Sequence, residues 1–255
     1  MIQIHHGQIQ NIPHLQVVQS EIEKKMLPAV FFIHGFTSAK EHNLHYAYYL
    51  AKLGFRVILP EAPLHGERST NEAEQELESS FWDIVTSAID ELPYFVDELT
   101  RKQFIDPQRI GVVGTSMGGI VALGALTQYS WIKVAASLMG TPAYASFAKS
   151  QVNAFKKSAQ SLSLSEAEEQ NLYKKLETYD LSKQPERLKG RPLLFWHSEI
   201  DDVVPFEPTY NFFQKAQKFY KHDPQKIKFI RDKTSGHKVS RQGVLETVRW
   251  FEKHL

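Results

Sequence analysis

Residues 114–119, GTSMGG, contain the spacing Gly-x-Ser-x-Gly between a β-branched run and an amphipathic run. A serine in this spacing, on a sharp turn from a strand into a helix, can act as a nucleophile because the turn lifts its hydroxyl above the sheet. The hydroxyl is weakly nucleophilic near neutral pH, so it needs a neighbouring base, and the base needs an acid to orient it. Ser116 is therefore the candidate nucleophile of an acyl-transfer reaction. The alternative is a tight turn with an N-capping serine.

The candidate base is a histidine that follows Ser116 in the chain. Where a nucleophilic serine lies on such a strand-to-helix turn, the serine, the acid and the histidine come in that order along the chain. His237 lies in a glycine-containing loop between the last expected strand and the last expected helix. His197 ends an expected strand, His222 ends an expected helix, and His254 is next to the C-terminus. We therefore predict that His237 is the base.

The candidate acid lies in LLFWHSEIDDVVP, residues 193–205, where a turn follows an expected strand. Asp201 and Asp202 both fit, and Glu199 is a third candidate. We favour Asp201 because it is nearer to the strand end, whereas Asp202 would more easily be a solvated turn residue.

Acyl transfer also needs two preorganised donors for the oxyanion that forms on the substrate carbonyl. One is expected to be the backbone N–H of Met117, directly after the serine, and the other the backbone N–H of Phe36 in the segment IHGF. We expect His34 to hold this loop by a hydrogen bond. The alternative for IHGF is an ordinary turn at a strand end.

The elements that must position these residues alternate along the chain. Apolar runs predict strands at 28–34, 55–60, 109–114, 133–140, 191–197 and 226–230, and helical patterns cover 39–55, 117–129, 206–220 and 241–255. This alternation predicts a doubly wound, mostly parallel α/β sheet. The first 20 residues alternate as edge strands do. A long helical pattern runs from Glu74 to Arg101, and Pro93 is expected to kink or split it.

The alternation stops over residues 143–190, which are polar, lysine-rich and mostly helical in pattern. We predict a small helical cap here, inserted into a core made of residues 1–142 and 191–255. Its apolar side chains could form a lid over the site, or they could simply pack on the core. They are Tyr144, Phe147, Phe155, Leu162, Leu164, Leu172, Tyr173 and Leu176.

Four segments, FFIHGF, DPQRIGVVGTSMGG, WHSEIDDVVP and SGHKVS, resemble in this order the α/β-hydrolase superfamily. The nearest branch holds small bacterial esterases similar to dienelactone hydrolases and to the catalytic domain of prolyl oligopeptidases. The resemblance runs from about Pro28 to the C-terminus. One departure is Ser198, where many relatives have glycine. PEAPLHGER, residues 60–68, resembles a family loop that could place His65 or Arg68 near the site mouth, although a surface turn fits equally.

The resemblance implies a serine hydrolase that cleaves small carboxylic esters through a Ser116–His237–Asp201 triad and an acyl-enzyme. A peptidase, a thioesterase or a deacetylase remains open. The large peptidases of this branch carry a β-propeller, for which we expect no room in 255 residues. A non-catalytic binding protein on the same scaffold is a further alternative, although no member of the triad is missing.

Composition narrows the partners. With 30 basic and 29 acidic residues, we expect neither nucleic acid nor a membrane as partner, and the absence of cysteine excludes thiolate chemistry. No cofactor is expected, because no dinucleotide or phosphate-loop motif occurs. The pairs His5–His6 and His42–His45 have no carboxylate at motif spacing, so we expect no metal. The N-terminus has no signal-peptide pattern, which favours a cytoplasmic enzyme. We expect its partner to be a small ester, and a homodimer remains open.

Overall fold

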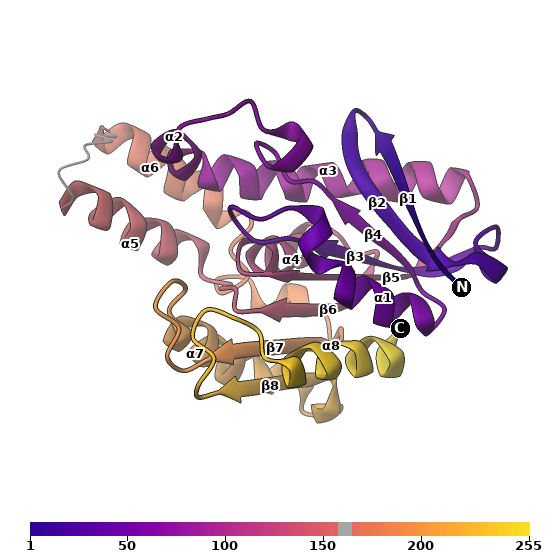
Figure 1. Ribbon diagram of the computed structural model, residues 1–255. Coiled ribbons are helices and arrows are strands. Elements are labelled where there is room, and N and C mark those ends of the chain that lie inside the picture. The colour runs from indigo at the N-terminus through magenta and orange to yellow at the C-terminus, as the bar shows by residue number, and fades with distance from the viewer. Residues whose placement is uncertain (158–164) are drawn as a thin grey trace.

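The computed structural model describes residues 1–157 and 165–255 (Figure 1). Its strands form one sheet in the order β1-β2-β4-β3-β5-β6-β7-β8, in which β1 and β2 are antiparallel to their neighbours and the other pairs are parallel. The strands are β1 (Ile2–Ile9), β2 (Ile12–Gln19), β3 (Leu27–Ile33), β4 (Arg56–Pro60), β5 (Ile105–Thr115), β6 (Ile132–Leu138), β7 (Leu193–Ser198) and β8 (Ile227–Asp232). The predicted doubly wound, mostly parallel sheet is confirmed.

Helices cover both faces of this sheet. They are α1 (Leu44–Lys52), α2 (Glu74–Ser79), α3 (Phe81–Arg101), α4 (Met117–Gln128), α5 (Tyr144–Lys157), α6 (Glu166–Glu177), α7 (Phe206–Ala216) and α8 (Arg241–His254). On one face, Leu50 of α1 and Phe251 of α8 pack with strand residues such as Val113. On the other, Leu123 of α4 and Phe212 of α7 are buried in a larger core that also includes α3. No helix in the described ranges has both the length and the apolar character needed to cross a bilayer.

The first hairpin differs from the expectation of edge strands. β1 is the sheet edge, but β2 lies between β1 and β4. Leu15 and Val17 of β2 join the core on the α1 face. On the other face, the His14 ring packs edge-on against Phe95 of α3, with 5.2 Å between ring centroids. The edge assignment is therefore wrong for β2, which has a strand on each side and a helix on each face. Its alternating pattern is misleading because one of its buried residues, His14, is polar.

The long helical pattern is interrupted at Ser80 and not at Pro93. The hydroxyls of Ser79 and Ser80 donate to the carbonyl of Glu76 at 2.8 and 2.9 Å, and such local bonds compete with helix continuation. Pro93 lies inside α3 and cannot donate to the carbonyl of Ile89 one turn earlier. The Tyr129 hydroxyl donates to that carbonyl at 3.2 Å instead. The expected split at Pro93 is wrong, because α3 continues through this residue, and a side chain from outside the helix replaces the missing donor.

Within residues 143–190 the described part consists of α5, α6 and a 3-10 turn at Pro185–Leu188, without a strand. Figure 1 shows α5 and α6 beside α2, to one side of the sheet. Tyr144 and Leu176 are buried in the main core, and Leu172 packs against it. Leu162 and Leu164, which we expected on the apolar face of a cap, lie outside the described residues.

Candidate active site

Ser116 lies at the junction of β5 and α4 with φ 53° and ψ −118°, and its backbone N–H donates to the carbonyl of Leu138 at 2.8 Å. Non-glycine residues rarely adopt a positive φ, and such strain clusters at functional positions. The local conformation is that of a sharp strand-to-helix turn. It therefore places the serine side chain at the end of the sheet where the parallel strands finish.

The neighbouring glycines allow this turn to pack tightly. A Cβ atom at Gly118 would lie 2.0 Å from the carbonyl oxygen of Ile33 on β3, and one at Gly114 would lie 2.3 Å from the carbonyl carbon of Gly118. Both distances are far below any van der Waals contact. The Gly-x-Ser-x-Gly spacing is thus explained by the close approach of α4 to β5 and β3.

The structure brings the predicted serine, histidine and acid together. The Nε2 atom of His237 is 2.8 Å from Ser116 Oγ, and its Nδ1 atom is 2.9 and 2.8 Å from the two carboxylate oxygens of Asp201. With a proton on Nδ1, the imidazole donates to Asp201 and accepts from the serine hydroxyl. The three residues come from loops after β5, β7 and β8, whose carboxyl ends lie at one edge of the sheet.

The Asp201 carboxylate is completely buried, and N–H groups of the protein donate hydrogen bonds to it in place of water. Its Oδ1 atom accepts from the backbone N–H groups of Val203 and Val204 at 3.0 and 2.9 Å. Burial alone would raise the pKa of Asp201, but hydrogen bonds from His197, His237 and Val204 outweigh burial and hold that pKa well below its ordinary value. The Asp201 carboxylate is therefore ionised near neutral pH, where it can accept the hydrogen bond from His237 Nδ1.

The other two candidates for the acid lie elsewhere. Asp202 is exposed to solvent. The Glu199 carboxylate pairs with Arg231 at 2.6 Å. The hydrogen bonds of the His237 ring go to Asp201 and Ser116 instead.

His197 is a neighbour of the site that sequence reasoning missed. Its ring is 1% exposed, and its Nε2 atom is 2.9 Å from the carbonyl of Val204 and 3.3 Å from Asp201 Oδ2. Its place at the end of an expected strand argues against a role as the base and gives no hint of its contact with Asp201. The signal was its spacing, four residues before Asp201 across a turn that folds back on the strand end.

The loop after β3 runs beside the nucleophile. A Cβ atom at Gly35 would lie 3.5 Å from the Cβ of Ser116, so the two backbones are adjacent. Met117 is buried at the start of α4, and Phe36 is partly buried. The assignment of their backbone N–H groups to an oxyanion hole stays a prediction.

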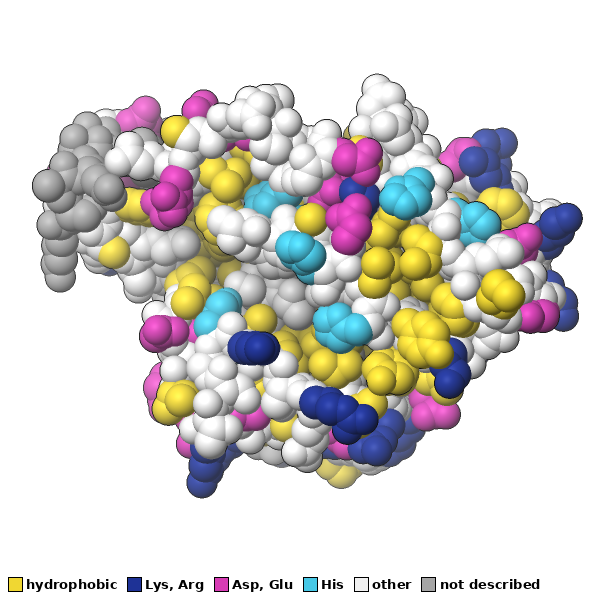
Figure 2. All heavy atoms as spheres, viewed as in Figure 1, with side chains coloured by type: hydrophobic (Ala, Val, Ile, Leu, Met, Phe, Trp, Pro, Cys, Tyr) yellow, Lys and Arg dark blue, Asp and Glu magenta, His cyan; other side chains and the backbone are white. Residues whose placement is uncertain are grey.

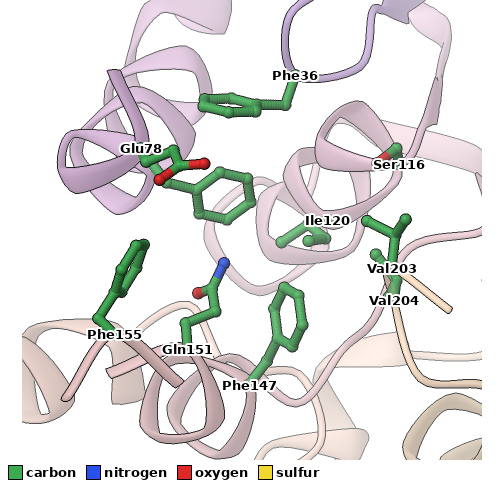
Figure 3. A pocket seen from close by; sticks show the side chains of 10 residues that line it. Phe36, Glu78, Ser116, Ile120, Phe147, Gln151, Phe155, Val203 and Val204 are labelled. Atoms are coloured by element: carbon green, nitrogen blue, oxygen red, sulfur yellow. The ribbon is translucent and has the colours of Figure 1, made fainter. Parts of the chain in front are cut away.

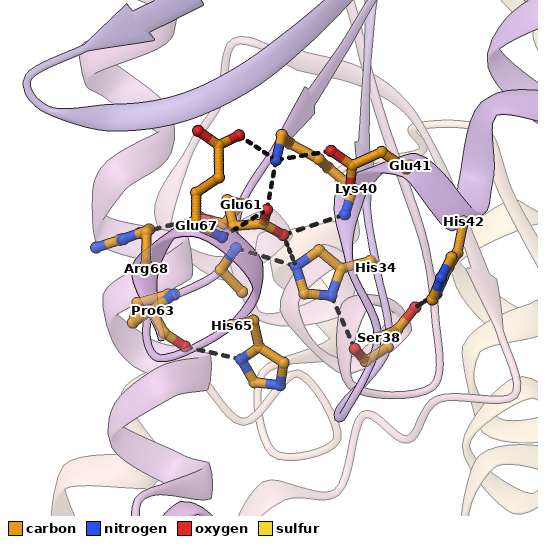
Figure 4. Close-up of polar contacts among 12 residues, drawn as sticks. His34, Ser38, Lys40, Glu41, His42, Glu61, Pro63, His65, Glu67 and Arg68 are labelled. Carbon is orange, nitrogen blue, oxygen red and sulfur yellow. Dashed lines mark hydrogen bonds and ion pairs between the residues drawn. The ribbon is translucent and has the colours of Figure 1, made fainter. Parts of the chain in front are cut away.

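Two histidines tie this loop to the segment after β4 (Figure 4). His34 Nδ1 is 2.8 Å from the carbonyl of Gly35, and its Nε2 is 3.0 Å from the N–H of Ala62. His65 Nε2 accepts from the N–H of Thr37 at 3.0 Å, while its Nδ1 donates to Pro63 at 2.8 Å. Burial lowers the pKa of His65, which keeps the ring in the neutral form that these bonds require.

Arg68, which the family resemblance could place near the site mouth, instead pairs with α3. Its guanidinium forms two hydrogen bonds of 2.8 and 2.7 Å with Glu91.

An ion cluster built on the buried pair Lys40 and Glu61 supports the same loops (Figure 4). The Lys40 side chain is 1% exposed, and its Nζ atom lies 2.6 Å from Glu61, 2.6 Å from Glu67 and 2.9 Å from Glu41. These three carboxylates are close enough to hold a metal ion together, and the single ammonium of Lys40 lies among them. Burial alone would raise the pKa of Glu61, whereas its contacts with His34 and Lys40 outweigh burial and lower that pKa to about 2.

A cavity of about 210 Å³ opens beside Ser116, and a second cavity of about 70 Å³ adjoins it. Most of the lining is aromatic or aliphatic, and Figure 3 places Ser116 on one side and Glu78 and Phe155 on the other. On the face drawn in Figure 2, histidine side chains gather around a hollow among hydrophobic side chains. The larger cavity is lined by Phe36, Glu78, Phe81, Ser116, Ile120, Phe147, Gln151, Phe155, Val203 and Val204.

Comparison with known proteins agrees with this architecture. A protein of Bacillus subtilis named "Putative esterase YitV" is 48% identical over 255 residues, which cover all of both chains. "Esterase YjfP" of Escherichia coli is 32% identical over 209 residues, 82% of each chain. The crystal structure of TT1662 from Thermus thermophilus has a TM-score of 0.78 over all of both chains at 16% identity, a likeness of fold alone.

The prolyl oligopeptidase family matches residues 42–255, a range that contains Ser116, Asp201 and His237. The order of the strands and the structural likeness are those of the α/β-hydrolase fold. The chain therefore belongs to the prolyl oligopeptidase family and is a hydrolase with the α/β-hydrolase fold.

Proposed function

We propose that this hydrolase cleaves small carboxylic esters, with Ser116 as nucleophile, His237 as general base and acid, and Asp201 as the group that orients the imidazole. The observation that carries the proposal is the 2.8 Å distance from Ser116 Oγ to His237 Nε2, combined with the buried Asp201 carboxylate on the opposite ring nitrogen. Hydrogen-bond reach between nucleophile and base, with a third group that orients the base, is the arrangement that serine hydrolysis requires.

In the first half of the reaction, Ser116 Oγ attacks the acyl carbon while its proton passes to His237 Nε2. The tetrahedral intermediate then collapses: the bond to the alcohol oxygen breaks, and that oxygen leaves with the proton from Nε2. In the second half, water attacks the acyl-enzyme, gives a proton to Nε2, and the same proton returns to Ser116 Oγ as the acid leaves. Asp201 stabilises the imidazolium in both halves.

The negative oxygen of each tetrahedral intermediate would be held by the backbone N–H groups of Phe36 and Met117. Gly35 lies against Ser116, which supports a role for the N–H that follows it. The hydrogen bond from Thr37 to His65 limits movement of this loop. Such donors, fixed before the charge develops, each typically contribute about 10²–10³-fold to the rate.

Esters are favoured over peptides because both curated relatives that match along most of the chain are named as esterases. The apolar cavity of about 210 Å³ beside Ser116 suits a short acyl chain. Phe147 and Phe155 of α5 line it, which supports the proposal that residues 143–190 form a cap over the site of a core made of residues 1–142 and 191–255. The family name makes a peptidase the alternative.

The test is a series of p-nitrophenyl esters of increasing acyl length, measured beside peptide anilides and acyl thioesters, with Ser116→Ala as control. We expect ester hydrolysis with a maximum at short or medium length, and loss of more than about 10³-fold in the variant. Cleavage of peptides without esters would overturn the esterase assignment. Undiminished ester turnover in Ser116→Ala would overturn the site.

A further inference from the structure

The two joined cavities beside Ser116 have a single charged lining residue among those that the structure describes, Glu78 of α2. Its side chain is half-buried, and no hydrogen bond or ion pair of its carboxylate occurs within the described ranges. The ammonium groups of Lys156 and Lys175, on the neighbouring α5 and α6, pair with Glu169 and Asp83 instead. Among the side chains that the structure describes, the cavity therefore has an anion and no cation of its own.

Two neutral polar residues, Ser79 and Gln151, line the cavities beside Glu78 and cannot balance that charge. The Ser79 hydroxyl donates to the carbonyl of Glu76. The Oε1 atom of Gln151 accepts from the indole N–H of Trp82 at 2.8 Å, which fixes the orientation of the amide. The amide nitrogen is left toward the cavity, as Figure 3 shows. Since the carbonyl of Gln151 is engaged, Glu78 is the acceptor that a donor on a bound molecule would meet.

Aromatic rings complete the surroundings of this carboxylate. Phe81 and Phe155 line both cavities together with Glu78, and Phe36 lines the larger one. Phenyl faces attract ammonium groups, and a carboxylate in a wall of low polarity attracts them more strongly than it would in water. The same carboxylate repels an anion.

We propose that Glu78 is a specificity-determining residue that favours esters whose acyl chain ends in an ammonium group. With the ester carbonyl at Ser116, the chain would cross the apolar middle of the cavity, and its cationic end would lie between the Glu78 carboxylate and the rings of Phe81 and Phe155. This inference rests on the esterase function proposed above and adds the charge of the substrate to it.

The experiment compares three p-nitrophenyl esters of matched length: heptanoate, 6-aminohexanoate and the monoester of adipic acid, each corrected for spontaneous hydrolysis and cyclisation. They differ in a neutral, cationic or anionic chain end. We expect the ratio of kcat/KM for the cationic ester to that for the neutral ester to fall about tenfold in Glu78→Gln, mainly through KM, and the anionic ester to improve. Glu76→Gln, an exposed change of the same kind on the same helix, should leave these ratios within about twofold.

An unchanged ratio in Glu78→Gln, or an equal change in Glu76→Gln, would overturn the role of Glu78. A failure of the esterase proposal looks different, because none of the three esters would then depend on Ser116. In that case the role of Glu78 is tested by ligand binding. Calorimetry should show hexylammonium binding about tenfold more weakly to Glu78→Gln than to the unmodified protein. Equal binding would overturn the inference.

Discussion

His197 and Asp201 are in contact beneath the candidate active site: Nε2 of the imidazole lies 3.3 Å from Oδ2 of the carboxylate, and both side chains are buried. The same carboxylate binds His237 at 2.8 Å, so one acid lies between two imidazoles. Because His197 also reaches the carbonyl of Val204 at 2.9 Å, it holds the turn from which Asp201 projects. Its effect on catalysis would be indirect, through the position and ionisation of Asp201.

His197→Leu should lower kcat about tenfold and leave KM nearly unchanged. The reason is the loss of one hydrogen bond to a charged group, about 1.5–3 kcal/mol, of which part is felt in the transition state. The measurement is steady-state hydrolysis of a p-nitrophenyl ester across pH, since a displaced Asp201 also changes the acid limb of the profile. His222→Leu, at an exposed position, is the control, and equal losses in the two variants would contradict the role of His197.

Asp201→Asn and Asp202→Asn separate the two neighbouring acids. An asparagine at 201 would offer an N–H to His237 Nδ1 and favour the wrong tautomer, so kcat should fall by about 10⁴-fold. The exposed Asp202 should tolerate the change within about twofold. A larger loss in Asp202→Asn than in Asp201→Asn would transfer the orienting role to Asp202.

The Lys40–Glu61 pair predicts a stability effect rather than a change of chemistry. Lys40→Met should lower the free energy of unfolding by about 3–5 kcal/mol near neutral pH, because it leaves a buried carboxylate without its cation. The pKa of Glu61 is lowered from 4.5 to about 2, so its contribution is complete above pH 4.5 and is lost as pH falls toward 2. The gap between variant and unmodified protein should therefore narrow over that range in urea unfolding. Lys24→Met, at an exposed lysine, should cost under about 0.5 kcal/mol, and an equal cost would contradict the account.

The Tyr129 hydroxyl is predicted to stabilise α3 at Pro93. Tyr129→Phe should lower the free energy of unfolding by about 1–2 kcal/mol, because the carbonyl of Ile89 loses its donor. In a Pro93→Ala background the backbone N–H is restored, so the same change should cost much less. Thermal or urea unfolding of the four proteins in this double-mutant cycle gives the coupling directly. Equal costs in both backgrounds would show that the hydroxyl does not replace the missing donor.

Much of this architecture could be predicted because it depends on local pattern. Strands β3 to β8 follow apolar runs, and the turn at Ser116 follows a glycine spacing that only close backbone packing explains. The order of serine, acid and histidine along the chain then favours His237 among the histidines, and nearness to the strand end favours Asp201 over Asp202.

The features that escaped prediction depend on how separate elements, or the two ends of one turn, fold against each other. At Pro93 the carbonyl of Ile89 is satisfied by the Tyr129 hydroxyl, which comes from another element. Lys40 can be buried because its ammonium pairs with the buried carboxylate of Glu61. The contact of His197 with Asp201 depends on how a turn folds back, which periodicity does not encode. The unpaired charge of Glu78 is recognisable only once the walls of the cavity are known.

The most direct test of the account is labelling with a fluorophosphonate, followed by peptide mass spectrometry. The account predicts one adduct on Ser116, no labelling in Ser116→Ala, and labelling slowed by several orders of magnitude in His237→Ala. An adduct on another residue, or labelling that proceeds at the original rate without the imidazole of His237, would contradict it.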